Sequence, residues 1–172
     1  MILAIDPGNE KSAFVVLDDN NLKTVVGGIL ENGDILEIIA NSSCDRMAIE
    51  MVASYGMAVG KEVFETVFWI GRFYEQARAN DNIVYIGRIY RKDVKMNLCN
   101  TMRAKDSNVR QALIDRFGVV GTKKNPGWFY GFKADIWSAY AVGVTYWDTV
   151  ARGIDDVERY LAETKLSKPD KS

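Results

Sequence analysis

The chain has 172 residues, of which 48% are hydrophobic and 26% charged, a composition that predicts one globular domain with its own core. It contains no histidine, which excludes serine-histidine triads, HExxH sites and zinc sites built from histidine and cysteine. The two cysteines, Cys44 and Cys99, are far apart, so we expect neither a disulfide framework nor a cysteine zinc site, and a reducing cytoplasm fits best. We expect no secretory leader and no membrane span, because no apolar run approaches the ~20 residues that a bilayer requires.

The net charge of −1 hides a strong asymmetry along the chain. Residues 1–87 carry 6 basic and 13 acidic side chains, whereas residues 88–133 carry 11 basic and 3 acidic ones. Chance clustering of charges on solvated faces is one explanation. An excess of positive charge in so short a segment favours the other, a surface that faces phosphates.

The first elements of the chain are predicted to be strands. Residues 2–5 and 12–17 are apolar runs on either side of the turn sequence DPGNEK, a pattern typical of a β-hairpin. Residues 22–30 and 35–40, separated by the turn sequence ENGD, are interpreted as further strands or as a strand followed by a helix.

Strands and helices are expected to alternate in the middle of the chain. Residues 47–52, MAIEMV, are an apolar run interrupted by Glu50, and a glycine-punctuated loop follows. Residues 61–79 show the spacing of a helix with a wide aromatic face, which is predicted to pack on a sheet and to offer a possible dimer face. Residues 83–86 are predicted as a strand, and residues 106–117 as a helix capped by its first or second residue.

A loop rich in glycine, lysine and aromatic residues covers positions 118–134, before an apolar helix at 135–151. A short final helix is expected at 154–164, and residues 165–172 are expected to form a flexible tail. The order of elements predicts an α/β fold in which a mixed central β-sheet, antiparallel in its first strands, is flanked by helices. Residues 1–164 are expected to form a single domain.

Three carboxylates stand beside hydrophobic sequence, where an unpaired charge is costly to bury. Asp6 ends the first apolar run, Glu50 interrupts the fourth, and Asp135 opens the last apolar helix. If the three converge, they repel one another unless a cation neutralises them, and Mg²⁺ prefers such oxygen ligands. Each has a plainer alternative: a turn residue, the exposed side of an edge strand, and a helix N-cap.

Five segments together resemble the RuvC-like Holliday junction resolvases of the RNase H-like superfamily. They follow one another over residues 1 to about 150 and read AIDPGNEKSAFVVLD, MAIEMV, RIYRKDVKMNLC, AKDSNVRQAL and KADIWSAYAVGVTYW. Sugar kinases and Hsp70-like ATPases share related first strands, so the DPG turn alone is weak, and the ordered set is more specific. The short acidic set is similar to that of phage-encoded members of the family.

The resemblance implies an RNase H-like fold, a homodimer and cleavage of four-way junctions with Mg²⁺ or Mn²⁺, two ions being expected. It makes Asp6, Glu50 and Asp135 the metal ligands and catalytic carboxylates. The family places another Asp three residues after the residue that opens the last helix, and here that position is Ser138, a poor metal ligand. Asp148 lies too far along the same helix to replace it. The enzyme is expected in the cytoplasm of a bacterium or of a phage-infected host.

Basic side chains of the middle segment are predicted to bind branched DNA through its phosphates. They are Arg88, Arg91, Lys92, Lys95, Arg103, Lys105, Arg110, Lys123, Lys124 and Lys133. Lys105 is the candidate for contacting the scissile phosphate as a catalytic residue. Trp128 is a candidate for stacking on bases and Tyr55 for wedging at a junction centre, with packing as the alternative for both.

Three rival functions remain open at this stage. An actin-like ATPase needs a second phosphate-binding hairpin, a Gly-rich adenosine motif and a chain about twice as long; the sequence has neither motif, which disfavours this function. A DNA-binding protein that has lost catalysis is supported by Ser138. A nuclease of the same fold with broader substrates, such as flaps, forks or RNA-containing duplexes, is not excluded by sequence.

Overall fold

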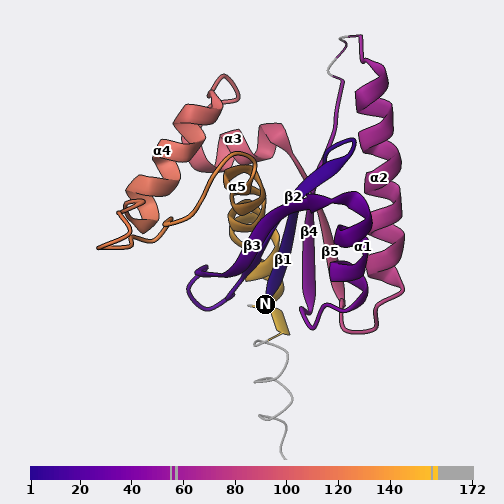
Figure 1. Cartoon of the computed structure of the whole chain (residues 1–172), viewed down its shortest axis with the longest axis horizontal. Helices are drawn as coiled ribbons and strands as arrows, with labels where there is room; N and C mark the ends of the chain where they lie inside the picture. The colour runs from indigo at the N-terminus through magenta and orange to yellow at the C-terminus, as the bar shows by residue number, and fades with distance from the viewer. Residues whose placement is uncertain (55, 57, 156, 159–172) are drawn as a thin grey trace, which may run out of the picture.

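A five-stranded mixed sheet forms the centre of this computed structural model, which describes residues 1–54, 56, 58–155 and 157–158 (Figure 1). The strands are β1 (Ile2–Asp6), β2 (Lys11–Leu17), β3 (Thr24–Glu31), β4 (Arg46–Met51) and β5 (Tyr85–Tyr90). Their order in the sheet is β3-β2-β1-β4-β5; β1, β2 and β3 are antiparallel, whereas β4 and β5 run parallel to β1. The predicted α/β class with antiparallel first strands is confirmed.

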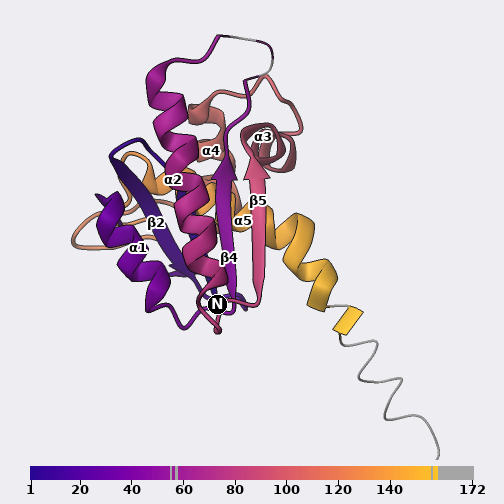
Figure 2. The ribbon, with the colours of Figure 1, turned by 90° about the vertical axis from the view of Figure 1, so that its right-hand side faces the viewer.

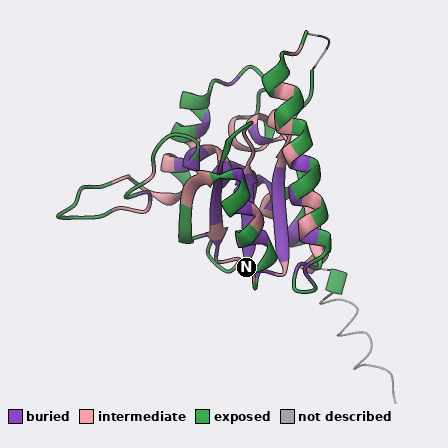
Figure 3. Ribbon diagram, turned by 45° about the vertical axis from the view of Figure 1, so that its right-hand side comes forward, coloured by how far each residue is buried: buried purple, intermediate pink, exposed green. Residues whose placement is uncertain are grey.

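Helices cover both faces of this sheet (Figures 1 and 2). They are α1 (Asn32–Ala40), α2 (Lys61–Arg78), α3 (Arg91–Cys99), α4 (Asp106–Phe117), α5 (Ile136–Tyr146) and the π-helical turn η1 (Trp147–Ala151). Alternate strand residues point to opposite faces, so Leu3 and Ile5 pack with α1 and α2, while Ile2 and Ala4 pack with α5. Figure 3 shows the buried strands between helices whose outer sides are exposed.

Helix α5 lies unusually close to the sheet because of a glycine at the contact. A side-chain carbon added at Gly143 would lie 2.6 Å from Leu17 Cδ1 and 2.9 Å from the Cβ of Ala4. Almost every residue of α5 is buried, as its apolar sequence predicts. The close approach fixes the C-terminal half of α5 against β1 and β2.

Two elements differ from the sequence prediction. The last strand covers Tyr85–Tyr90 rather than 83–86, and Val84, predicted inside it, is 66% exposed. Helix α3 follows at once, where only a loop was expected. Its charged residues hide the apolar period, and its start is marked by Asp93, whose carboxylate accepts a hydrogen bond from the Tyr90 N–H at 3.2 Å.

Other expectations near the helices have mixed outcomes. The choice of a strand followed by a helix is confirmed by β3 and α1. The capping of α4 by Asp106 or Ser107 is wrong: Lys105 occupies the cap, and its N–H donates to Asn108 Oδ1 at 2.8 Å. Helical backbone continues past η1 over residues 152–155 and 157–158, and the rest of the expected final helix and the tail lies outside the described residues. Within the described part of the chain, no helix is long and apolar enough to cross a membrane.

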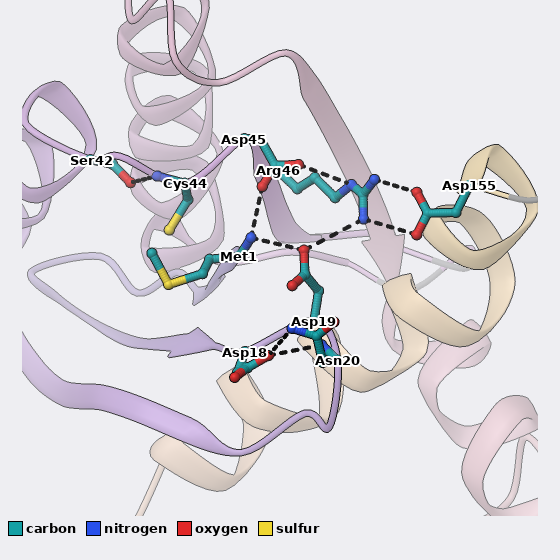
Figure 4. A network of polar contacts seen from close by, with 9 residues as sticks. All are labelled: Met1, Asp18, Asp19, Asn20, Ser42, Cys44, Asp45, Arg46 and Asp155. Atoms are coloured by element: carbon teal, nitrogen blue, oxygen red, sulfur yellow. Dashed lines mark hydrogen bonds and ion pairs between the residues drawn. The ribbon is translucent and has the colours of Figure 1, made fainter. Parts of the chain in front are cut away.

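The edge of the sheet where β1 and β4 begin carries a dense set of ion pairs (Figure 4). The amino group of Met1 donates to Asp19 at 2.9 Å and to Asp45 at 2.7 Å. The buried Arg46 pairs with Asp155 and lies 3.8 Å from Asp19. These contacts tie the end of the α5–η1 helix to the first residues of the strands.

The turn between β1 and β2 is held by two buried polar side chains. Ser12 Oγ accepts a hydrogen bond from the Gly8 N–H at 3.1 Å and donates to Asn32 Oδ1 at 2.6 Å. Asn32 Nδ2 in turn donates to the Gly8 carbonyl at 3.0 Å. A Cβ at Gly8 would lie 2.2 Å from the Lys11 carbonyl oxygen, so the turn that follows Asp6 requires glycine.

The first prediction concerns this turn. Gly8→Ala is expected to lower the free energy of unfolding by roughly 1–3 kcal/mol, because the added methyl group forces the turn open. Gly33→Ala is the control: nothing lies within 4 Å of its position in the first turn of α1, and alanine favours helix. Urea unfolding measures both, and equal destabilisation by the two variants would contradict the account.

Candidate active site

Asp6 and Glu50 end two neighbouring parallel strands at the same edge of the sheet. Ile5 of β1 stands opposite Ile49 of β4, so the two carboxylates that follow are adjacent. Since Ile5 and Ile49 pack toward α1 and α2, Asp6 and Glu50 point to the opposite face, which α5 covers. Glu50 does not lie on an edge strand, because β4 runs between β1 and β5. The Glu50 side chain is 14% exposed.

Asp135 reaches the same face from the N-terminal end of α5. It occupies the N-cap position, yet its side chain makes no hydrogen bond to the backbone N–H groups of the first turn of α5, all of which the structure describes. The preceding Ala134 has a φ of 42°, a left-handed conformation that an alanine adopts at a cost and that fixes the direction of the chain at Asp135. Ser138 lies one helical turn further on, and both residues line a pocket of about 360 Å³.

Burial favours the protonated form of both paired carboxyl groups, and the charge of Glu50 adds to this effect at Asp6. Burial raises the pKa of Asp6 to about 8, and the neighbouring Glu50 and Asp135 add to the rise. Burial also raises the pKa of Glu50, although Arg91 opposes that shift and Asp6 shares a hydrogen bond with Glu50. Two like charges side by side in a half-buried site therefore favour proton or cation binding.

Arg91, the first residue of α3, lies among these carboxylates. Its Nη1 is 3.7 Å from Glu50 Oε2, and its Nη2 pairs with Asp106. Arg91 lines both the pocket beside Asp6 and Glu50 and the pocket beside Asp135. Sequence reasoning placed Arg91 on a DNA-binding surface and treated Asp106 as a helix cap, so it missed the position of both beside the carboxylates.

The donor set suits a hard divalent cation, since it offers carboxylate oxygens without histidine or a nearby thiol. In this conformation no three acidic or thiol side chains among the described residues are close enough together to enclose one ion. Asp6 and Glu50 are adjacent, while Asp135 acts on Asp6 through its charge. Mg²⁺ commonly takes one or two carboxylates and keeps several waters, so the adjacent pair fits such an ion.

The predicted basic residues occupy different positions around this site. Arg110 lies 4.5 Å from the centre of the Trp137 ring and lines the pocket of Asp135. Lys95 lines a neighbouring pocket with Arg91 and Lys92. Arg88 is further away, in a groove with Met96 and Val150 beside η1.

The remaining predicted residues lie further out. The exposed ones are Arg103, Lys105, Lys123, Lys124 and Lys133. Lys123 and Lys124 are carried by a hairpin closed by a bridge between Gly121 and Pro126, which projects beside α4 in Figure 1. Tyr55 lies outside the described residues.

Trp128 contributes to the packing of the loop that precedes α5. Its indole N–H donates to the Tyr140 hydroxyl at 3.0 Å, and its ring stacks on Phe117 with centroids 5.5 Å apart. Phe129 is fully buried in the same aromatic cluster. The packing alternative thus describes the contacts of Trp128.

Asp148 lies in η1, which continues α5, and its carboxylate is paired with Arg116.

The second prediction is the pH dependence of stability in EDTA. Because the folded pKa of Asp6 is raised above its unfolded value, the ionised carboxylate destabilises the fold progressively as pH rises from 4 through about 8. Asp6→Asn keeps the neutral form, so it is expected to gain roughly 1–3 kcal/mol over the wild type between pH 4 and pH 9. Urea unfolding at both pH values measures this gain. The exposed Asp81→Asn is the control, and a gain for Asp6→Asn no larger than the control's would contradict the electrostatic description.

No protein-family model and no curated protein matches the sequence, but solved structures match the fold. A structure of RuvC from Thermus thermophilus superposes with a TM-score of 0.65 at 15% sequence identity, covering 88% of this chain and 96% of RuvC. T. thermophilus RuvC in complex with a Holliday junction substrate gives a TM-score of 0.60 at 16% identity, covering 84% and 91% of the two chains. The chain therefore has a RuvC-like fold of the RNase H-like type.

Proposed function

We propose that this chain is a metal-dependent, structure-selective DNA endonuclease that resolves four-way junctions and other branched DNA. The observation that carries the proposal is the pairing of Asp6 and Glu50 at one edge of a RuvC-like sheet, with Asp135 at the helix end beside them. Like charges that are held together with few partners destabilise a fold, and such groups are common at binding and catalytic sites. The proposed catalytic unit is a single domain of residues 1–164, acting in the cytoplasm.

Asp6, Glu50 and Asp135 are proposed to hold Mg²⁺ or Mn²⁺, two ions being expected. Bound ions would activate a water molecule and stabilise the leaving oxygen in phosphodiester hydrolysis. Asp6 and Glu50 must give up their shared proton for this, so metal binding is expected to strengthen as pH rises. Ala134 contributes by fixing the direction of the chain at Asp135, and Gly143 by letting the body of α5 pack closely on the sheet.

The DNA is proposed to cross the face formed by α3, α4 and the loop before α5. Arg110 lines the pocket of Asp135 and Lys95 lines a neighbouring pocket with Arg91, while the hairpin with Lys123 and Lys124 extends the cationic surface outward. The other proposed contacts are Arg88, Arg91, Lys92, Arg103, Lys105, Lys133 and Tyr55, whereas Trp128 is expected to support the loop before α5 by packing. Phosphate contacts of this kind position a substrate without reading its sequence.

A homodimer is proposed to form through α2. Phe64 and Phe68, one helical turn apart, are 64% and 63% exposed, and Val67 between them is 39% exposed. Three apolar side chains on one outer helix face form the kind of patch that a second copy covers in a twofold dimer. Two active sites related by such an axis suit a four-way junction, which is itself pseudo-symmetric.

The third prediction concerns cleavage. With Mg²⁺ or Mn²⁺, the protein is expected to nick a labelled four-way junction in paired, symmetric positions, and Asp6→Asn is expected to reduce the rate by at least about 100-fold, since it removes a proposed ligand of both ions. A linear duplex of matched sequence and a fork are compared in the same assay. Equal cutting of forks and junctions would replace the resolvase with a general branched-DNA nuclease.

A second candidate function is a branched-DNA-binding protein with weak or no catalysis, because Ser138 faces the Asp135 pocket where an acid is expected. The same assay separates it from the nuclease. Tight junction binding without cleavage in either metal would support the binding protein, and cleavage gained by Ser138→Asp would identify the missing carboxylate as the cause.

The fourth prediction tests the dimer. Phe64→Ser combined with Phe68→Ser is expected to shift the protein to monomer, since each buried aromatic side chain at an interface contributes roughly 2 kcal/mol or more. Val25→Ser on the edge strand β3 removes a comparably exposed apolar group and should leave the dimer intact. Sedimentation equilibrium gives the masses. A wild-type monomer at tens of micromolar, or a dimer that survives the double substitution, would overturn the proposal.

A further inference from the structure

Arg91 is placed where a surface DNA contact is not expected. It begins α3 directly after β5, so two regular elements fix its backbone at the edge of the sheet that carries Asp6 and Glu50. Its side chain is 26% exposed, whereas the neighbouring basic residues Lys92 and Lys105 are exposed. Among the charges that stabilise ionised Glu50, Arg91 acts most strongly and Lys95 less so.

The guanidinium is incompletely bonded. Its Nη2 pairs with Asp106, which is 77% exposed. Its Nη1 is buried, has no hydrogen-bond partner among the described residues, and lies 3.7 Å from Glu50 Oε2, beyond hydrogen-bond range. A buried donor without an acceptor is costly, so this geometry favours a further acceptor at the site.

Arg91 also connects the two halves of the site. It lines the pocket of Asp6 and Glu50 and the pocket of Asp135 and Ser138, so its charge lies between the carboxylates. An arginine stays protonated at every working pH, and its planar fork matches phosphate oxygens.

We propose that Arg91 is the resident cation of this site: it neutralises Glu50 while no metal ion is bound, competes with the ion for that carboxylate, and then turns its spare Nη1 donor to the DNA phosphate. The inference rests on the proposed metal-dependent function and adds a residue to it. Arg91, rather than the exposed Lys105, becomes the basic side chain that meets the phosphate beside the carboxylates.

The first arm of the test measures Mn²⁺ binding to the protein alone by titration calorimetry. Arg91→Gln is expected to bind Mn²⁺ about tenfold more tightly than the wild type, because a competing charge is removed. Lys92→Gln changes the net charge equally at an exposed position and is expected to change the affinity less than about twofold. Arg91→Lys retains the charge and is expected to stay near the wild-type value.

The second arm measures four-way junction affinity in EDTA and in saturating Ca²⁺. Arg91→Gln is expected to match the wild type in EDTA and to bind about tenfold more weakly in Ca²⁺, since the guanidinium reaches the phosphate only after the ion takes Glu50. Lys92 is proposed as an ordinary phosphate contact, so Lys92→Gln should weaken junction binding to a similar extent in EDTA and in Ca²⁺. Arg91→Lys, which keeps the charge but loses the fork, should show part of the Ca²⁺-specific loss.

The outcomes separate the two proposals. If the wild type binds Mn²⁺ but Arg91→Gln binds it no more tightly than Lys92→Gln, or if Arg91→Gln weakens junction binding equally with and without Ca²⁺, the role of Arg91 is overturned and the metal site stands. If the wild type binds no Mn²⁺, the metal site and the role of Arg91 both fall. If circular dichroism shows that Arg91→Gln does not fold, Arg91→Lys replaces it in the measurement of junction affinity. An equal loss of affinity in EDTA and in Ca²⁺ would then overturn the proposal.

Discussion

The site depends on one electrostatic constraint: two carboxylates are held side by side at the ends of adjacent, buried, parallel strands. Asp6 and Glu50 are placed there by the register of β1 and β4, so the sheet fixes the backbone positions of both. Burial raises the pKa of both groups, and the neighbouring charge of Glu50 adds to the rise at Asp6. The turn fixed by Ser12 and Asn32 and the basic side chain of Arg91 are best understood as support for this pair.

The two edges of the sheet satisfy their charges in different ways. At the edge where the strands begin, the Met1 amino group and Arg46 are surrounded by aspartates, and the ion pairs close on one another (Figure 4). At the other edge, carboxylates outnumber Arg91 and open onto pockets. Opposite charges that pair with one another hold a structure together, whereas an excess of one sign beside a pocket favours the binding of a ligand of the other sign. The edge with Met1 and Arg46 therefore stabilises the fold, and the edge with Asp6 and Glu50 is the proposed binding site.

Much of the fold and part of the site could be predicted from sequence, for physical reasons. Strands β1 and β2 show as apolar runs around a glycine turn, and Asp6 and Glu50 stand out because each interrupts hydrophobic sequence. Helix α3 and the position of Arg91 could not be predicted, since a short charged helix has no clear apolar period and a contact between Arg91, Glu50 and Asp106 depends on tertiary packing. Asp106 was assigned to the helix cap because it opens the helical sequence 106–117, and its ion pair with Arg91 cannot be recognised from sequence.

The central claim is that Asp6, Glu50 and Asp135 together form a divalent-metal site. A crystal structure of the wild type soaked in Mn²⁺, with anomalous diffraction recorded at the manganese absorption edge, tests this claim most directly. The account predicts an anomalous peak within bonding distance of the Asp6 and Glu50 carboxylates, with Asp135 drawn toward it or toward a second peak. Anomalous density elsewhere, with Glu50 still beside Arg91, would contradict it.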